Sequence, residues 1–325
     1  MSSLAPVLIT VYDRLDCLQN AIASLKTNNE CNKTDLYIVS DYAYQEEHKK
    51  IISQIREYIK NIKGFQKVEG IFWDHNKGSF NSAQDAMKYL FSKYDKVIFF
   101  EDDILVSNRF LEYMNNALEF YKDDQRIISI ASHRHHKIKI PKEYPYDVFL
   151  LKIYSPWGSA IWKDRYESID WELKDVDSFL KDKEQIKAFN NISTHMLPIL
   201  LDMLNKKKKY GDAIICYNML KSKRYTLFPI EPLSVNRGHD GRGEHCVEDI
   251  ELQNQVLAMD FYPSLTKNLP YDTTIGKMHH KVFYSFRRDF LEPFLKKIYL
   301  YRPLRFLKKQ IEKIIFPRKK FWKSY

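Results

Sequence analysis

The chain of 325 residues is long enough to bury a full hydrophobic core, as one large domain with an appendage or as two domains. Hydrophobic residues make up 44% and aromatic residues 14% of it, which excludes an intrinsically disordered chain. The net charge is +10, but segment 281–325 alone carries 14 Lys or Arg residues against three acids, a net of +11, so residues 1–280 carry −1.

Four cysteines are scattered along the chain, at Cys17, Cys31, Cys216 and Cys246, without a C-x-x-C pair. This usage is typical of reduced thiols, so we expect a cytoplasmic protein. The N-terminus lacks the basic segment of a secretion signal, and no stretch approaches the ~18 uninterrupted apolar residues of a membrane-spanning helix. We therefore expect neither secretion nor insertion into a bilayer.

The first hundred residues alternate between strand and helix patterns. Repeated units of this size predict an α/β fold, with a Rossmann-like, mostly parallel sheet flanked by helices and ligands bound at the carboxyl ends of the strands. No Gly-x-Gly-x-x-Gly follows the first strand and no P-loop occurs, which argues against a dinucleotide fold and a P-loop enzyme. The strand patterns cover 6–12, 35–42, 68–73 and 96–100, and the helix patterns cover 13–26, 46–62 and 79–93.

Beyond residue 130 the pattern becomes less regular. A loop-rich basic stretch spans 132–149, and helices are expected at 174–187 and 194–208. The basic stretch contains three histidines, to which we assign no role: His133, His135 and His136.

Three adjacent carboxylates, Glu101, Asp102 and Asp103, close the fourth strand pattern. Side chains alternate along a strand, so we expect Glu101 and Asp103 on one side and Asp102 on the other. This much negative charge at a core edge costs free energy unless a cation neutralises it, and Mg²⁺ or Mn²⁺ takes carboxylate oxygens together with substrate phosphates. The acids therefore predict a divalent metal site, which requires a cavity beside them and oxygens not held solely by arginines or amides. An acidic helix cap is the alternative, because a helical pattern follows Ser107 and Asn108.

The C-terminal segment is basic and aromatic. Apolar residues recur at helical spacing within 290–298 and 304–315, which predicts two amphipathic basic helices. Their Lys and Arg faces and the aromatic residues that close the chain favour an anionic membrane surface. As an alternative, the apolar stripes pack on the main domain and the basic faces are solvated. Nucleic acid is not expected as a partner, because no recognised binding signature accompanies the charge.

Together with the three acids, polar residues in five further segments resemble a nucleotide-sugar-dependent glycosyltransferase of the GT-A fold. The likeness spans roughly residues 5–250 in scattered motifs, and it is greatest to the N-acetylglucosaminyltransferase I type, with some similarity to bacterial family 2 enzymes. It implies a GT-A catalytic domain over 1–262 and a basic helical extension over 263–325. The segments are YDR (12–14), IVSD (38–41), HNKGSFNSAQDAM (75–87), KKYGDAIICYNML (208–220) and SVNRGHDGRGEHC (234–246).

The resemblance implies roles in donor binding for residues of the first two segments. Thr10, Tyr12 and Arg14 match residues that contact uridine and ribose, and Asp41 matches the aspartate that accepts a hydrogen bond from uracil. Glu101 and Asp102 belong to the "DXD" element of such enzymes. Its last acid, here Asp103, ligates the ion that bridges the nucleotide diphosphate. Arg14 equally suits the start of a helix, and Asp41 equally suits an Asx-turn after a strand.

The segment 75–87 matches the helix start that approaches the diphosphate. Gly78 would permit close approach of the backbone, while Asn81 and Ser82 would supply polar contacts. This chain departs from the family pattern at Ser82, where a histidine is usual, and the turn alone would also explain Asn76 and Gly78.

Asp212 stands where inverting relatives carry the catalytic base, which takes the proton of the acceptor hydroxyl. A helix N-cap is its alternative role. In 234–246, the resemblance implies that His245 completes the metal site, with His239 as the competing choice. Imidazole favours Mn²⁺ over Mg²⁺. A glycine-rich lid that closes over the donor is the alternative interpretation of this segment.

Taken together, these features predict a metal-dependent, inverting glycosyltransferase. It would move GlcNAc or a related hexose from a UDP-sugar to a saccharide hydroxyl, in the synthesis of a bacterial capsule, lipooligosaccharide or lipid-linked oligosaccharide. The Trp157-Gly158 loop would shape the acceptor side, and the basic tail would hold the enzyme at the inner face of the cytoplasmic membrane. A nucleotidyltransferase acting on sugar phosphates is one rival, although no glycine-rich basic loop follows the first strand. A non-enzymatic membrane-surface or nucleic-acid binding protein is another, and it leaves the acids unexplained.

Overall fold

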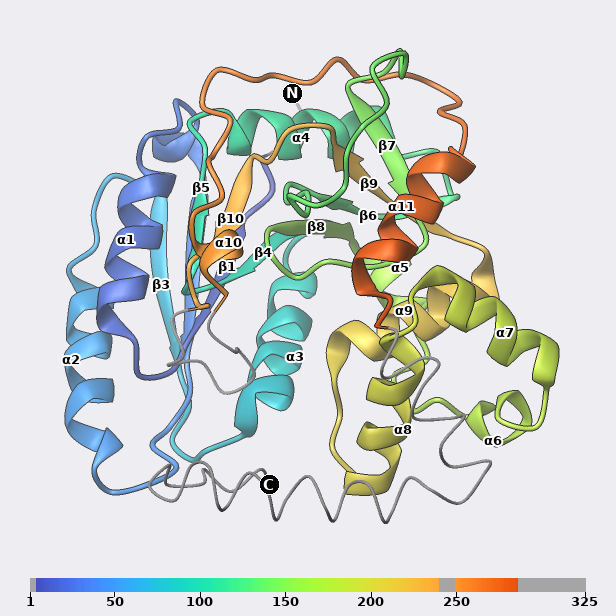
Figure 1. The fold of residues 1–325 in the computed structure, drawn as a ribbon. Coiled ribbons are helices and arrows are strands. Elements are labelled where there is room, and N and C mark those ends of the chain that lie inside the picture. Colours follow the sequence, from blue (N-terminus) through green and yellow to red (C-terminus); the bar gives the residue numbers. More distant parts are fainter. Residues whose placement is uncertain (1–3, 240–248, 286–325) are drawn as a thin grey trace, which may run out of the picture. The chain divides into compact units, whose positions relative to one another are not determined.

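A computed structural model describes residues 4–239 and 249–285 (Figure 1). The chain divides into two compact units, Met1–Val282 and Phe283–Tyr325, and nearly all of the described residues belong to the first. The domain boundary expected at residue 262 stays a prediction. The two amphipathic helices expected within 290–298 and 304–315, and also His245, lie outside the described residues.

The strand and helix patterns of the first hundred residues are confirmed. An eight-stranded sheet runs in the order β3-β2-β1-β4-β8-β6-β9-β7, and β5 and β10 form a separate two-stranded ribbon. The strands are β1 (Val7–Val11), β2 (Asp35–Ser40), β3 (Lys67–Phe72), β4 (Lys96–Glu101), β5 (Ile104–Val106), β6 (Ile127–Ala131), β7 (Val148–Leu151), β8 (Ser159–Trp162), β9 (Tyr225–Pro229) and β10 (Ser234–Asn236).

The helices pack on both faces of the sheet, so the molecule has the layered α/β architecture that the sequence predicts (Figure 1). The pairs β1·β2, β1·β4, β2·β3 and β6·β9 are parallel. The helices are α1 (Leu15–Leu25), α2 (His48–Lys60), α3 (Gly78–Phe91), α4 (Phe110–Phe120), α5 (Lys163–Glu167), α6 (Val176–Phe179), α7 (Lys183–Ile192), α8 (Met196–Lys206), α9 (Gly211–Ser222), α10 (Ile250–Gln253) and α11 (Thr273–Phe283), with a 3₁₀ turn η1 (Cys31–Lys33).

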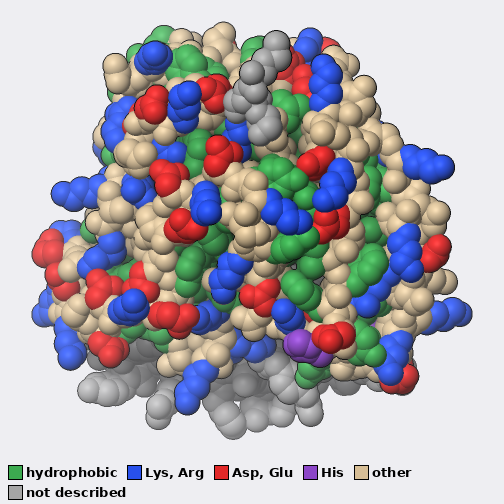
Figure 2. Space-filling model, turned by 180° about the vertical axis from the view of Figure 1, so that it is seen from behind, with side chains coloured by type: hydrophobic (Ala, Val, Ile, Leu, Met, Phe, Trp, Pro, Cys, Tyr) green, Lys and Arg blue, Asp and Glu red, His purple; other side chains and the backbone are tan. Residues whose placement is uncertain are grey.

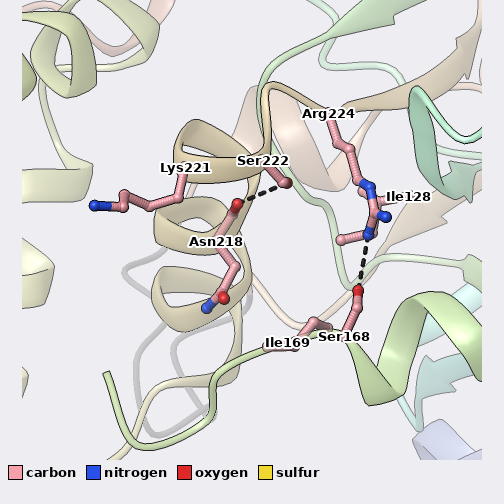
Figure 3. A pocket seen from close by; sticks show the side chains of 7 residues that line it. All are labelled: Ile128, Ser168, Ile169, Asn218, Lys221, Ser222 and Arg224. Carbon is pink, nitrogen blue, oxygen red and sulfur yellow. Dashed lines mark hydrogen bonds between the residues drawn. The ribbon is translucent and has the colours of Figure 1, made fainter. Parts of the chain in front are cut away.

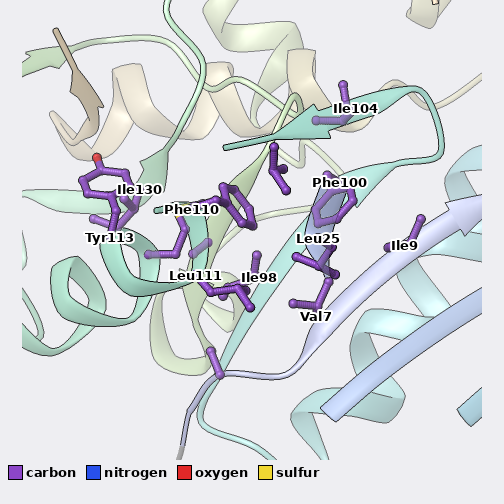
Figure 4. Packing of buried hydrophobic residues seen from close by; sticks show 14 of the residues in the cluster. Val7, Ile9, Leu25, Ile98, Phe100, Ile104, Phe110, Leu111, Tyr113 and Ile130 are labelled. Carbon is purple, nitrogen blue, oxygen red and sulfur yellow. The ribbon is translucent and has the colours of Figure 1, made fainter. Parts of the chain in front are cut away.

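Two hydrophobic cores lie on opposite faces of the sheet, because side chains alternate along each strand. Val7 and Ile9 of β1 belong to a core shared with α1, α2 and α4, whereas Leu8 between them belongs to a core shared with α3, α8 and α9. In the first core, the rings of Phe100 and Phe110 meet edge to face with centroids 5.7 Å apart (Figure 4). The core therefore extends to the last residues of β4 and anchors the point where the acids begin.

The edge strand β7 runs antiparallel to β9. Two further antiparallel elements lie near β4. Strand β8 lies between β4 and β6 and runs antiparallel to both. Strand β10 pairs antiparallel with β5, so that Asn236 faces Ile104. These pairings bring chain segments from far along the sequence to the carboxyl end of β4.

The prediction of one continuous helix over 174–187 is wrong. The chain forms the short α6 and then α7, with a break at Leu180–Asp182. Asp182 causes the break, because its carboxylate accepts hydrogen bonds from the backbone N–H groups of Glu184 and Gln185 and so starts a new helix. The helix expected over 194–208 is confirmed as α8.

The surface seen from behind carries Lys and Arg side chains interspersed with Asp and Glu (Figure 2). This mixture agrees with the near-neutral balance of residues 1–280. No helix among the described residues is long and apolar enough to cross a bilayer.

Candidate functional site

The acids at the end of β4 converge on one arginine. Asp102 and Asp103 are 2% and 4% exposed, and Arg14 donates from Nη2 to Asp102 Oδ1 and from Nη1 to Asp103 Oδ2, the latter over 2.8 Å. The expectation that Asp102 and Asp103 point to opposite faces is wrong. Strand β4 ends at Glu101, and the chain turns through the two aspartates before β5, so strand alternation no longer applies there.

One carboxylate oxygen of the pair is left without a hydrogen-bond partner. Asp103 Oδ1 is buried, and no described residue bonds to it. Asp103 also lines a cavity of about 90 Å³, together with Asp16, Cys17, Asn20, Leu105 and Arg237. This is space for an ion with a few waters, since each water takes about 30 Å³. A cavity thus adjoins Asp103, and Arg14 does not hold every oxygen of the two aspartates, while the metal site itself stays a prediction.

The sheet itself brings Arg14 to the acids. Strands β1 and β4 are parallel neighbours with Thr10 opposite Glu101, and the backbone N–H of Asp102 donates to the Thr10 carbonyl over 3.1 Å. The chain therefore leaves both strands at the same edge, and Arg14, the residue before α1, lies within reach of the carboxylates. Sequence reasoning placed Arg14 near a nucleotide and missed its contact with the acids, which only the strand order reveals.

The charged groups of this cluster shift one another's pKa values. Burial, followed by the Asp103 and Asp102 carboxylates, raises the pKa of Glu101 to about 8. Burial raises the pKa of Asp102 to about 7, although Arg14 opposes the change. Burial alone would lower the pKa of Arg14, but Asp102 and Asp103 raise it above its usual range. The raised pKa values of Glu101 and Asp102 mean that the ionised carboxylates are unfavourable at this site, and a further cation would stabilise them.

Asp212 is brought to the same site from a distant part of the chain. It lies in the first turn of α9 rather than at the N-cap, which is Tyr210. Its charge is among the causes that raise the pKa of Glu101 and of Tyr154. The Tyr154 hydroxyl, 2.8 Å from Ser159 Oγ at the start of β8, lies in the same neighbourhood. The predicted base therefore lies near the acids, as a catalytic role requires.

The loops after β2 and β3 are tied together by Asp41. Its carboxylate accepts hydrogen bonds from the backbone N–H of Tyr42 and from that of Lys77, the latter at 3.0 and 3.2 Å. The Asn76 side chain donates to the Tyr42 carbonyl over 2.7 Å. Gly78, with φ 74°, then begins α3. These bonds go to the next residue and to a distant loop, not two residues on as in an Asx-turn, and the carboxylate fixes the start of the predicted diphosphate segment.

Three other predicted donor contacts have partners within the protein. The Tyr12 hydroxyl accepts from the Tyr44 backbone N–H and lies 2.7 Å from His48 Nδ1. Ser82, buried in α3, accepts from Trp73 Nε1 over 3.0 Å, and Asn81 donates to the Lys77 carbonyl over 3.1 Å. The structure does not bring Ser82 together with the acid cluster, and the donor roles of these residues remain predictions.

Two histidines flank Trp157. Its ring meets His133 at 4.8 Å and His239 at 5.4 Å between centroids, both edge to face. Nε2 of each histidine is buried without a hydrogen-bond partner among the described residues. Burial lowers the pKa of His133 to about 3, so it is neutral at physiological pH. The sequence left His133 without a role, and its contact with the Trp157 loop depends on β10, which no local pattern reveals.

A larger cavity of about 310 Å³ lies away from the carboxylates. It is formed at the C-terminal end of α9, whereas Asp212 is at the N-terminal end, and Arg224 crosses it to donate to Ser168 Oγ over 2.7 Å (Figure 3). The carboxylates that carry the candidate chemistry do not line it. Its lining residues are Ile128, Ser168, Ile169, Asn218, Lys221, Ser222 and Arg224.

Within 4–239 and 249–285, no three His, Cys, Asp or Glu side chains form a metal-binding group. Two buried aspartates and an orphaned oxygen nevertheless fit Mg²⁺ or Mn²⁺, which are commonly held by one or two carboxylates with waters and substrate phosphates. Asp103 is the first choice as ligand, with Asp102 beside it.

Solved structures that match the chain include a mannosyltransferase from Pyrobaculum calidifontis in complex with GDP-Man and Mn²⁺, at 10% identity over 49% of this chain and 44% of its own, with a TM-score of 0.36. A fragment of S. aureus TarS matches at 12% identity over 71% and 59% of the two chains, with a TM-score of 0.39. GalNAc-T7 with UDP, GalNAc and Mn²⁺ matches at 11% identity over 72% and 44%, with a TM-score of 0.44. This chain thus spans less than two thirds of the length of each.

No protein with a curated description matches the chain. The family model described as "Glycosyl transferase family 2" matches residues 7–182, more than half of the sequence, and this span contains β1, the acid cluster and β8. The expected GT-A fold is thereby confirmed, whereas the N-acetylglucosaminyltransferase I subtype remains a prediction. The chain belongs to glycosyl transferase family 2.

Proposed function

We propose that this protein is a metal-dependent, inverting glycosyltransferase that transfers GlcNAc or a related hexose from a UDP-sugar to a hydroxyl of a saccharide acceptor. One observation carries the proposal: two buried aspartates lie at the carboxyl end of β4, and one of them, Asp103, has an oxygen without a hydrogen-bond partner and lines a cavity. Burying a carboxylate oxygen without a hydrogen-bond partner costs free energy unless a bound ligand supplies the missing partner.

Asp103, together with Asp102, would hold the divalent ion. When bound, the ion would offset the negative charge that builds on the leaving diphosphate. His245 is the proposed protein nitrogen ligand and His239 its competitor, and a nitrogen ligand would favour Mn²⁺ over Mg²⁺. The backbone before α3, which Asp41 fixes, would approach the diphosphate at the N-terminus of that helix.

Asp212 would act as general base. A saccharide hydroxyl is a poor nucleophile, and a carboxylate within hydrogen-bond reach takes its proton as the new glycosidic bond forms. Attack by the activated hydroxyl on the face opposite the leaving group inverts the anomeric carbon. The nearness of Asp212 to Glu101, seen in their electrostatic coupling, supports an acceptor position beside the donor site. Trp157, between two histidines, would form part of the acceptor wall.

The donor contacts proposed from the sequence remain part of this account. Thr10, Tyr12 and Arg14 follow or end β1, at the strand edge where the acids lie. Asp41 would accept a hydrogen bond from uracil in addition to those it already accepts, because a carboxylate has about four acceptor positions. A UDP-sugar is therefore the proposed donor.

Turnover with a panel of nucleotide sugars tests the function. Full-length protein is mixed with UDP-GlcNAc, UDP-glucose, UDP-galactose or GDP-mannose, with Mn²⁺ or with a chelator, and release of nucleoside diphosphate is measured. We expect release from a UDP-sugar that needs the metal and is lost in Asp103→Asn. Asp95→Asn is the matched control, because Asp95 is an exposed aspartate at the opposite end of β4. Chelator-insensitive release, or full activity in Asp103→Asn, would contradict the proposal.

The acceptor and the place of action are also proposed. The basic aromatic segment 281–325 would hold the enzyme at the anionic inner face of the cytoplasmic membrane, where a bacterial envelope glycan or its lipid-linked precursor is assembled. Sedimentation with anionic vesicles tests this: a chain truncated before Phe283 should remain in solution while the full chain pellets. Equal sedimentation of both would overturn the membrane proposal and leave the catalytic one untouched.

A further inference from the structure

Arg14 occupies the carboxylates that the proposed metal needs. Its two terminal nitrogens each donate to a different aspartate, so one guanidinium group spans Asp102 and Asp103. The side chains of both acids are no more than 5% exposed, whereas that of Arg14 is 21% exposed. The acids are therefore fixed in the interior, and the arginine reaches them from the surface side.

The arginine is the internal counter-charge of the site. Two buried carboxylates so close together repel each other unless a cation lies between them, and a forked guanidinium suits a pair of carboxylates well. A divalent cation beside Asp103 Oδ1 would lie close to the guanidinium and be repelled by it. The arginine and the metal ion are thus alternative partners of the same acids.

Apart from the two acids, Arg14 has little to hold its side chain in place, so it can leave once another cation takes over its role. It is the N-cap residue of α1 and makes no side-chain capping bond to that helix. Among the described residues, the hydrogen bonds and ion pairs found for its side chain are those to the two aspartates. The side chain is 21% exposed, and its charge needs a new anion once it leaves the aspartates.

We propose that Arg14 is a latch that keeps the metal site closed until a nucleoside diphosphate arrives. The diphosphate offers Arg14 a replacement anion and brings oxygens for the metal ion, so that the arginine moves from Asp102 and Asp103 to the phosphates as the ion takes its place. Metal and nucleotide therefore bind cooperatively, and each strengthens the other by the same factor. This inference rests on the proposed function, because it assumes a metal and a diphosphate at this site.

A binding experiment tests the latch without turnover. Mn²⁺ is titrated into the full-length protein, and free Mn²⁺ is measured by its electron paramagnetic resonance signal. In the wild type, saturating UDP should strengthen Mn²⁺ binding at least tenfold. In Arg14→Gln, Mn²⁺ alone should bind at least tenfold more tightly than to the wild type. The gain from UDP should be smaller than in the wild type, because only the direct contact of the ion with the diphosphate then contributes to it. Arg109→Gln is the control, because Arg109 is an exposed arginine paired with Glu112 and should behave as the wild type.

Arg14→Lys is a second variant that keeps the test valid if Arg14→Gln misfolds. It keeps the charge but not the fork, so Mn²⁺ affinity without UDP should lie between those of the wild type and Arg14→Gln. Mn²⁺ affinity that is unchanged or weaker in both variants would overturn the latch while the proposed function stands. Failure of Mn²⁺ to bind any variant, even with UDP, would overturn the latch and the proposed metal site together.

Discussion

Gly238 packs directly against the carboxylate of Asp103. A Cβ atom on Gly238 would lie 2.0 Å from Asp103 Oδ2, which is far inside van der Waals contact, and 3.1 Å from Asn236 Oδ1. The backbone N–H of Arg237 also donates to the Asp103 carbonyl over 2.8 Å. The segment after β10 therefore forms one wall of the acid site, and glycine is required at 238 because the carboxylate lies so near.

Gly238→Ala should push Asp103 out of position. We expect Mn²⁺ affinity in the presence of UDP to fall at least tenfold, because the carboxylate must turn away from the new methyl group. Isothermal titration calorimetry with Mn²⁺ in the presence of UDP measures this affinity. Gly64→Ala is the control: Gly64 has φ 99° and lies in the loop before β3, so alanine there should lower stability by about 1 kcal/mol without changing metal affinity. Equal affinities of wild type and Gly238→Ala would contradict the proposed place of Asp103.

Asp212→Asn should abolish transfer but not donor binding. A base acts on the acceptor, so its loss should reduce the transfer rate by about 10²- to 10⁴-fold while UDP affinity changes little. Single-turnover kinetics and UDP titration separate the two effects. Asp202→Asn removes a half-exposed aspartate of α8 that pairs with Lys206 over 3.0 Å, and it should keep the wild-type rate. Equal loss of rate in both variants would show that the effect is structural.

Acid should destabilise the protein through its buried histidines. His279, on α11, is buried with Nδ1 3.3 Å from the Ile192 carbonyl, and burial followed by His195 lowers its pKa to about 4. An unfolded histidine has a pKa of about 6.5. As pH falls from about 6.5 to about 4, the unfolded chain therefore takes up a proton that the folded chain does not, and stability falls.

The contribution of His279 to this loss is on the order of 3 kcal/mol, because each pKa unit corresponds to about 1.4 kcal/mol. Urea unfolding at several pH values should show a weaker decline in His279→Gln than in the wild type over this window. Asp102 and Glu101 have raised pKa values in the folded protein, so their protonation stabilises the folded state as pH falls. This opposite effect is the same in both proteins, so the difference between their stability curves isolates the contribution of His279. Parallel curves for the two proteins would contradict a buried, neutral His279.

Phe100→Ala should destabilise the core beneath the acids. Phe100 is fully buried at the end of β4 and packs on Phe110, so the change leaves a cavity, and the free energy of unfolding should fall by about 3–5 kcal/mol. Urea denaturation measures this. Phe120→Ala, on the same α4 as Phe110 but 38% exposed, should lower the free energy of unfolding by less than half as much. A small effect of Phe100→Ala would mean that the core does not extend to this point.

Local sequence patterns predicted the first half of the fold because its elements follow one another along the chain. Strands β1 to β4 and helices α1 to α3 each appear as an apolar run or an amphipathic repeat. The place of β4 beside β1 rather than beside β3 does not follow from their order along the chain. The acid cluster was also predictable, since charge after a buried strand is visible in the sequence. The position of β8 between β4 and β6 was not, because a four-residue apolar strand does not reveal its partner.

Contacts between distant residues explain what sequence reasoning missed at the site. Arg14 and Asp103 are 89 positions apart, and their pairing follows from the register of β1 on β4. Gly238 reaches Asp103 because β10 pairs with β5. The alternation assumed for Asp102 and Asp103 failed because β4 ends at Glu101, before the two aspartates. Residue type indicated the chemistry in each case, but tertiary structure decided which groups meet.

The binding of UDP with and without metal tests the central claim most directly. UDP is titrated calorimetrically into full-length wild type in Mn²⁺, into wild type in chelator, and into Asp103→Asn in Mn²⁺. If the acids after β4 hold an ion that also holds the diphosphate, the second and third titrations should show at least tenfold weaker binding than the first. Equal affinity in all three would contradict the account.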